Sequence, residues 1–122
     1  MSSNKTFFQQ FNEAFAKGDI NFIIEHVTED IQWTMVGEPP IKGKVEFSKA
    51  LETMANGETH ELTISNIITD EHTVAVDGIF TMVSQSGDAK RYAFCDVYLL
   101  DTLENEKIKQ MTSYVITLET NG

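Results

Sequence analysis

The chain has 122 residues, of which 41% are hydrophobic, and a net charge of −10. This length predicts a single domain over residues 1–122, and the acidic balance argues against a nucleic-acid partner because phosphate backbones would be repelled. No apolar run approaches the roughly 18–20 residues of a membrane helix, and the first residues lack a signal-peptide pattern. We therefore expect a cytoplasmic protein with no membrane partner.

Three helices and one strand are predicted in the first half of the chain. The first helix carries apolar residues at helical spacing, namely Phe7, Phe8, Phe11, Ala14 and Phe15. Gly18 ends that helix, and Asp19 caps a short second one. Residues 31–36 alternate as a strand, with Trp33 and Met35 on one face. A third helix follows, with its apolar residues at Phe47, Ala50, Leu51 and Met54.

From there to the C-terminus the apolar pattern has a period of two residues. Strands are predicted over residues 61–68, 73–83, 91–100 and 108–118. Long strands in a twisted sheet curl. The fold class is therefore α+β, with three N-terminal helices packed on the concave face of a strongly curved, mostly antiparallel sheet. Such a cone encloses a pocket at its open end where the helices do not fill it.

The strand over residues 91–100 contains the residue that most needs an explanation. Tyr92, Phe94, Asp96 and Tyr98 share one face of this strand. A carboxylate among aromatic rings is costly unless it is solvated or paired. Burial would raise the pKa of Asp96 and make it a general acid/base near neutral pH. The alternative is an ion-paired or backbone-bonded aspartate near the rim of the pocket.

Several other side chains are predicted to point into the cone. They are Trp33, Met35, Phe80, Met82, Tyr92, Phe94 and Tyr98. The deepest of them are expected to be simple core. The tyrosine hydroxyls and the indole N–H need partners, and they could orient a polar group on a bound molecule. The expected ligand is a small hydrophobic or aromatic molecule.

Neither a metal site nor a cofactor is expected. His26, His60 and His72 are scattered and do not show metal-ligand spacing. The sequence contains no glycine-rich phosphate loop. Cys95 is interpreted as a small buried hydrophobe, since no histidine lies near it in the sequence.

The order of these elements carries a resemblance to a known family over about Thr6 to Leu118. The segments that support it are residues 16–19, 29–33, 37–43, 95–98 and 107–108. Together they resemble the nuclear transport factor 2-like (NTF2-like) superfamily and, within it, the SnoaL-like group. This fold hosts isomerases, polyketide cyclases, epoxide hydrolases and non-catalytic members. The family pattern also favours Met111, Ser113 and Val115 facing the cone in place of Tyr114.

Two catalytic residue sets of this fold are not retained. Ketosteroid isomerases use a tyrosine and two aspartates, whose positions correspond here to Phe11, Met35 and Asp96. Limonene epoxide hydrolases pair an arginine with an aspartate two residues away, whereas Arg91 and Asp96 differ by five and face opposite ways. SnoaL-type polyketide cyclases use an aspartate on this strand as acid/base, which Asp96 permits.

Two functions are therefore expected as alternatives. The first is an isomerase- or cyclase-like enzyme that uses Asp96 on a hydrophobic metabolite, with Phe11 and Ser113 also contacting the ligand. The second is a non-catalytic ligand-binding or dimerisation protein of the same fold. The outer sheet face also predicts a homodimer, because exposed apolar patches mark interfaces. Its apolar residues are Ala93, Cys95, Val97, Leu99, Ile79 and Val83.

Overall fold

The computed structural model describes residues 3–54, 58–83, 86–101 and 107–118. The helices are α1 (Ser3–Lys17), α2 (Ile20–Glu25) and α3 (Lys44–Met54). The strands are β1 (Val27–Met35), β2 (Ile41–Lys42), β3 (Glu58–Asp70), β4 (Thr73–Val83), β5 (Ala89–Leu100) and β6 (Ile108–Leu118). None of the helices in these ranges is long and apolar enough to cross a membrane.

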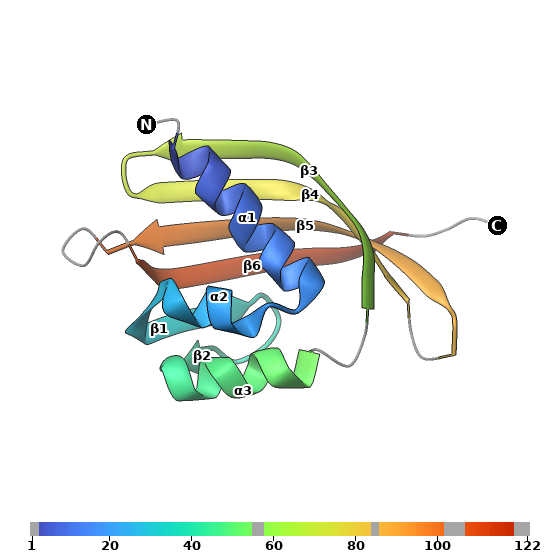
Figure 1. Cartoon of the computed structure of the whole chain (residues 1–122), viewed down its shortest axis with the longest axis horizontal. Helices are drawn as coiled ribbons and strands as arrows, with labels where there is room; N and C mark the ends of the chain where they lie inside the picture. Colours follow the sequence, from blue (N-terminus) through green and yellow to red (C-terminus); the bar gives the residue numbers. More distant parts are fainter. Residues whose placement is uncertain (1–2, 55–57, 84–85, 102–106, 119–122) are drawn as a thin grey trace.

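All six strands form one curved sheet in the order β2-β1-β6-β5-β4-β3. The pairing of β1 with β6 is parallel, and the other pairings are antiparallel. The three helices lie together on one side of the sheet, where α1 runs across the strands and α2 and α3 lie beside it (Figure 1). The predicted α+β cone is confirmed.

The predicted end of the first helix and the predicted cap of the second helix are also confirmed. Gly18 follows the last residue of α1 with a φ of +76°, a conformation that glycine adopts cheaply. The Asp19 side chain accepts a hydrogen bond of 3.3 Å from the Phe22 amide and caps α2. These two residues turn the chain so that α2 can follow α1 at once along the mouth of the cone.

The first strand differs from its prediction in extent. It begins at Val27 in place of residue 31, because Val27 pairs with Ile108 at the start of β6. The register between β1 and β6 then shifts before Gln32. This pairing depends on a strand more than 70 residues away, so the local pattern of β1 did not reveal it.

The short strand β2 was not predicted. Ile41 and Lys42 pair with Trp33 and Gln32 of β1. β1 ends at Met35, where the Glu38 amide donates to the Met35 carbonyl at 2.8 Å, and the chain folds back after the prolines at positions 39 and 40. The short strand β2 therefore covers the outer edge of β1 before α3 begins.

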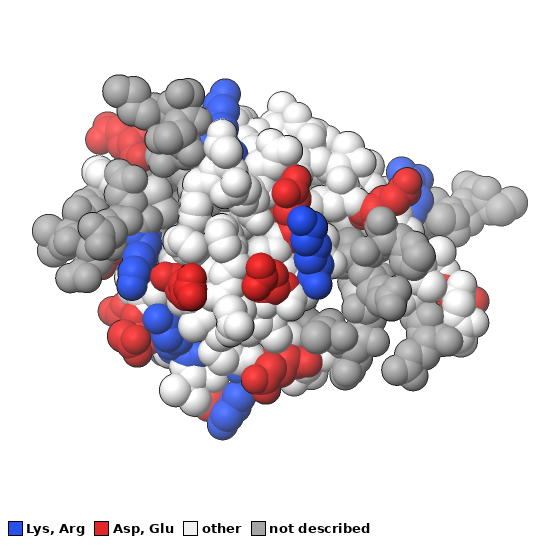
Figure 2. Space-filling model, in the orientation of Figure 1, with Lys and Arg blue, Asp and Glu red and all other residues white. Residues whose placement is uncertain are grey.

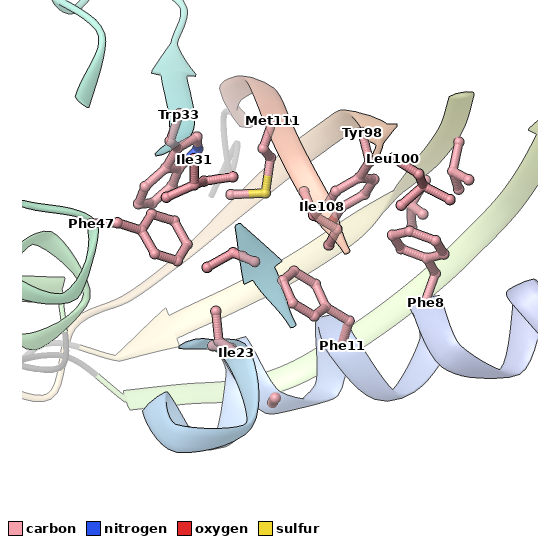
Figure 3. Packing of buried hydrophobic residues seen from close by; sticks show 14 of the residues in the cluster. Phe8, Phe11, Ile23, Ile31, Trp33, Phe47, Tyr98, Leu100, Ile108 and Met111 are labelled. Carbon is pink, nitrogen blue, oxygen red and sulfur yellow. The ribbon is translucent and has the colours of Figure 1, made fainter. Parts of the chain in front are cut away.

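The core lies between the helices and the concave face of the sheet. α1 contributes Phe8 and Phe11, α2 contributes Ile23, and α3 contributes Phe47, all of them at most 1% exposed. Figure 3 shows these side chains meeting residues of the strands. The labelled strand residues are Ile31, Trp33, Tyr98, Leu100, Ile108 and Met111. The aromatic stripe of α1 therefore holds the helix on the sheet.

Charged side chains are interspersed on the face of the molecule that carries the helices. Figure 2 shows acidic and basic groups side by side there, without a broad area of one sign. Two ion pairs lie among the described residues, Lys44 with Glu29 and Lys49 with Glu46. They are solvated and contribute little to stability.

The strong curvature of the sheet requires a glycine on its inner face. A Cβ atom added at Gly78 of β4 would lie 2.1 Å from the Thr63 carbonyl oxygen of β3. The register of β3 against β4 shifts next to this point, between Ile64 and Asn66. Gly78 therefore allows β3 to bend over the sheet and to form one wall of the cone.

Gly78→Ala should destabilise the fold by about 1–3 kcal/mol or more, because backbone atoms of β3 cannot move away as a flexible side chain would. Urea denaturation measures this loss. Thr73→Ala, an exposed position on the same strand, is the control and should change stability by less than about 0.5 kcal/mol. An equally small effect of Gly78→Ala would contradict this account of the curvature.

Candidate active site

A pocket of about 580 Å³ occupies the cone between the helices and the sheet. Its lining is mostly apolar and comes from all three helices and from β1, β3, β4, β5 and β6. The lining residues are Asn12, Phe15, Ala16, Lys17, Gly18, Ile20, Ile23, Trp33, Met35, Leu51, Leu62, Phe80, Met82, Phe94, Asp96, Met111, Ser113 and Val115. This size and composition fit a small-molecule site.

Exposure distinguishes the mouth of the pocket from its inner end. Lys17 and Gly18 are exposed, as is Val115 on the opposite wall. Asn12, Trp33 and Ser113, in contrast, are at most 5% exposed. The pocket therefore opens beside the C-terminus of α1 and places its polar side chains at the buried end.

Asp96 lies in β5 between Val76 of β4 and Ser113 of β6. Its Oδ2 atom accepts a hydrogen bond of 3.3 Å from the Tyr98 hydroxyl, and the Ser113 side chain also hydrogen-bonds to the carboxylate. Neither ion pair in the described part of the chain involves Asp96. The carboxylate is thus held by two neutral hydroxyls and has no cation beside it.

Burial raises the pKa of Asp96 to about 6, while the hydrogen bonds from Ser113 and Tyr98 act in the opposite direction and lower it. Desolvation dominates because it penalises the charged form more than two neutral donors stabilise it. At pH 7 roughly one carboxyl in ten is then protonated. Both protonation states are therefore populated near neutral pH, as proton transfer requires.

Each hydroxyl that contacts Asp96 also accepts a hydrogen bond from the N–H group of another side chain. Asn12 Nδ2 donates to the Tyr98 hydroxyl at 3.3 Å, and Trp33 Nε1 donates to Ser113 Oγ at 2.9 Å. Since each hydroxyl oxygen already accepts, its own hydrogen is available for the carboxylate. Burial and the nearby Asp96 raise the pKa of Tyr98, which keeps this hydroxyl protonated as a donor.

Seven of the residues singled out from the sequence line this pocket. They are Trp33, Met35, Phe80, Met82, Phe94, Asp96 and Ser113. The expected orientation of β6 is confirmed as well, since Met111, Ser113 and Val115 line the pocket while Tyr114 points outward and is 47% exposed.

Three other predicted residues lie elsewhere. Phe11 and Tyr98 are fully buried and do not line the pocket. α1 covers this part of the sheet, where its Phe8 packs against the tilted Tyr98 ring, with centroids 4.7 Å apart. Tyr92 stacks on Phe80 at 5.1 Å, outside the lining. Of the residues predicted to contact a ligand, Phe11, Tyr92 and Tyr98 therefore do not line this pocket.

Asn12 is the site residue that the sequence reading missed. It lies one turn after Phe8 on the buried face of α1, and it is 5% exposed. The available signal was a single amide on an otherwise aromatic stripe, because polar side chains at buried helix positions are expected to have a partner.

A second depression, between α1 and β3, is larger but more open. Its volume is about 680 Å³, and its lining includes Lys5, Gln9 and Glu13 of α1 but not Asp96. We take the pocket that contains Asp96 as the candidate site, since a mostly apolar cavity with a perturbed acid is a usual setting for small-molecule chemistry. In the described ranges, no three His, Cys, Asp or Glu residues are grouped to hold a metal ion.

Comparison with solved structures finds the same fold in proteins of several descriptions. An NTF2-like protein of unknown function from Cytophaga hutchinsonii is 28% identical, with a TM-score of 0.67 over 91% of this chain and 97% of that chain. A ketosteroid isomerase-like protein from Erwinia carotovora is 18% identical, with a TM-score of 0.70 over 88% and 89%. The epoxide hydrolase/cyclase-like enzyme SalBIII, with a role in pyran ring formation in salinomycin, is 17% identical, with a TM-score of 0.78 over 94% and 92%.

At these identities, the last two similarities show the fold alone. No curated protein matches the chain. A family model described as a SnoaL-like domain matches residues 8–111, which covers most of the sequence and includes Asn12, Trp33 and Asp96. The chain therefore belongs to the SnoaL-like domain family of the NTF2-like fold.

Proposed function

We propose that the pocket binds a small hydrophobic metabolite and that Asp96 acts there as a general acid/base in isomerase- or cyclase-like chemistry. The observation that carries this proposal is a carboxyl group with a pKa near 6 in an apolar cavity, held by hydroxyls without a neighbouring cation. The isomerase-like and cyclase-like descriptions of solved structures with this fold are consistent with it.

The common first step of such reactions is removal of a proton from a carbon next to a carbonyl group. The C–H bond breaks, the proton moves to the Asp96 carboxylate, and the electron pair remains as an enolate. The protonated Asp96 then returns the proton to another carbon in an isomerisation, or to the oxygen formed when the enolate carbon attacks a second carbonyl in a cyclisation. One residue can serve as base and then as acid, because its pKa lies near the working pH.

A specific observation also favours the non-catalytic alternative. Among the lining residues, Asp96 and Lys17 are the titratable ones, and Lys17 lies at the exposed mouth. A single acid without a second catalytic group is enough to orient a ligand. The exchange experiment below separates the two functions, because a binding protein would leave the α-protons of a bound ketone in place.

Asp96→Asn should reduce protein-catalysed deuterium exchange at the α-carbon of 2-tetralone in D₂O by roughly 100-fold or more, as expected for removal of a general base. NMR follows the loss of the proton signal. Ser113→Ala is the matched variant: it removes a donor that lowers the pKa of Asp96, so exchange should persist while its acid limb moves to higher pH. Unchanged exchange in Asp96→Asn, or none in the wild type, would contradict catalysis by Asp96.

Asp96→Asn should stabilise the fold at pH 8. The folded-state pKa of about 6 lies above the unfolded value near 3.9. The stability that the neutral carboxyl contributes is therefore present below about pH 4 and lost as the pH rises through 6. Asparagine does not ionise, so it should gain at most about 3 kcal/mol at pH 8 and little at pH 4. Urea denaturation at both pH values measures the difference. The quantity to compare is the difference in unfolding free energy between the variant and the wild type at each pH. If this difference were less favourable to the variant at pH 8 than at pH 4, Asp96 would be a structurally paired carboxylate.

We further propose that a second copy of the chain covers the outer face of the sheet. Strand β1 ends at Met35, opposite Ser113, so the rest of β6 extends beyond its neighbour. Tyr114 and Ile116 are 47% and 65% exposed there, while the expected contacts Ala93 and Cys95 beside them are half-buried. Apolar side chains exposed on adjoining strands favour a self-complementary contact.

Ile116→Glu should convert a dimer into a monomer, because it places a charge in the proposed apolar contact. Light scattering coupled to gel filtration gives the mass. The control is Val45→Glu on α3, which is 68% exposed on the side of the helices and should leave the mass unchanged. A monomeric wild type, or a dimer that persists in Ile116→Glu, would refute this interface.

A further inference from the structure

The orientation of the Asn12 amide is determined by its hydrogen bonds. Its Nδ2 atom donates to the Phe8 carbonyl oxygen at 2.8 Å and to the Tyr98 hydroxyl at 3.3 Å. A backbone carbonyl can only accept, so the nitrogen must lie on that side. Both amide hydrogens are thereby used within the protein.

The amide oxygen of Asn12, in contrast, has no donor among the described residues. In that part of the chain, Thr28 Oγ1 is the one fully buried side-chain polar atom that has no hydrogen-bond partner. The unpaired Asn12 oxygen is therefore not fully buried and keeps some access to solvent. Asn12 is 95% buried and lines the pocket. Its Oδ1 atom therefore faces the cavity as an unpartnered acceptor.

The neighbouring polar groups cannot satisfy this oxygen. The Ser113 hydroxyl accepts from Trp33 and hydrogen-bonds to Asp96, and the Tyr98 hydroxyl accepts from Asn12 and donates to Asp96. An apolar ligand that displaced water from Asn12 without supplying a donor would leave a buried acceptor unpaired, which costs affinity.

We infer that Asn12 is a specificity-determining residue that accepts a hydrogen bond from a hydroxyl group of the ligand. The pocket would thus select neutral apolar molecules that carry a hydroxyl, such as phenols, enols and hydroxyketones. A hydroxyl on an otherwise apolar molecule supplies one such donor and suits the mostly apolar lining. This inference rests on the ligand-binding part of the proposed function and not on catalysis.

Binding of 2-naphthol and 2-methoxynaphthalene tests this inference without any turnover. The ether keeps the ring system and the oxygen but cannot donate. The wild type should bind 2-naphthol roughly 3- to 10-fold more tightly, the usual contribution of one neutral hydrogen bond. Asn12→Leu, of similar volume, should bring this ratio to one or below, since the extra methyl group of the ether favours burial. Isothermal titration calorimetry gives both affinities.

Tyr98→Phe is the matched control for the Asn12 variant. It breaks the same Asn12–Tyr98 hydrogen bond but leaves the Asn12 oxygen in place, so the preference for 2-naphthol should remain. If Asn12→Leu does not fold, as judged by circular dichroism, Asn12→Ala removes the same oxygen without adding volume. In the wild type, the side-chain amide resonance of Asn12 should also shift with 2-naphthol and not with the ether.

Each outcome is decisive for one of the two proposals. Equal binding of both probes by the wild type, or a preference that persists without the Asn12 oxygen, overturns the inference about Asn12 and leaves the pocket proposal standing. If neither probe binds, the pocket does not accept small aromatic ligands, and the proposed function falls together with this inference. In Tyr98→Phe the shorter bond to the Phe8 carbonyl still holds the Asn12 amide nitrogen. Loss of the preference in this variant would therefore assign it to the Asp96 arrangement and would likewise overturn the role of Asn12.

Discussion

Desolvation of the Asp96 carboxyl is the constraint on which the properties of the site depend. Two hydroxyl donors stabilise its charged form, yet burial still raises its pKa to about 6. A lysine or arginine beside it would have lowered the pKa and produced a permanently charged group. The protein instead surrounds the carboxyl with apolar walls and neutral donors, so a modest change in ligand or solvent access can shift its protonation. Such a group is costly for folding and useful for proton transfer.

The hydrogen-bond network around Asp96 also connects α1 to the sheet and β1 to β6. Asn12 of α1 reaches Tyr98 of β5, and Trp33 of β1 reaches Ser113 of β6. Both connections lead to the same carboxyl group. A buried network in which almost every polar group is satisfied specifies one arrangement of the elements that contribute to it. The Asn12 oxygen departs from this rule, and it does so at the surface that a ligand would touch.

The two faces of the sheet carry different kinds of side chains. The inner face combines core packing with a mostly apolar cavity, and Gly78 allows β3 to approach β4 closely. The outer face carries exposed apolar residues where β6 extends past β1. Because side chains alternate along a strand, Ser113 and Val115 line the pocket while Tyr114 and Ile116 lie on the proposed dimer face. A partner subunit on this face would stiffen the strand that positions Ser113.

The sequence by itself determined the long strands of the second half and the face that Asp96 shares with the rings. Residues 73–83 and 108–118 form strands with the predicted bounds, because alternation and turn residues act locally. Only the tertiary structure decided which inward side chains reach the cavity. Phe11 of α1 is buried and Tyr98 is buried beneath that helix, so neither lines the cavity. The start of β1 depends on a distant pairing partner, Ile108. Asn12 and Tyr98 are 86 residues apart, and Trp33 and Ser113 are 80 apart. The first contact depends on how α1 packs across the sheet and the second on the pairing of β1 with β6, neither of which a local periodicity encodes.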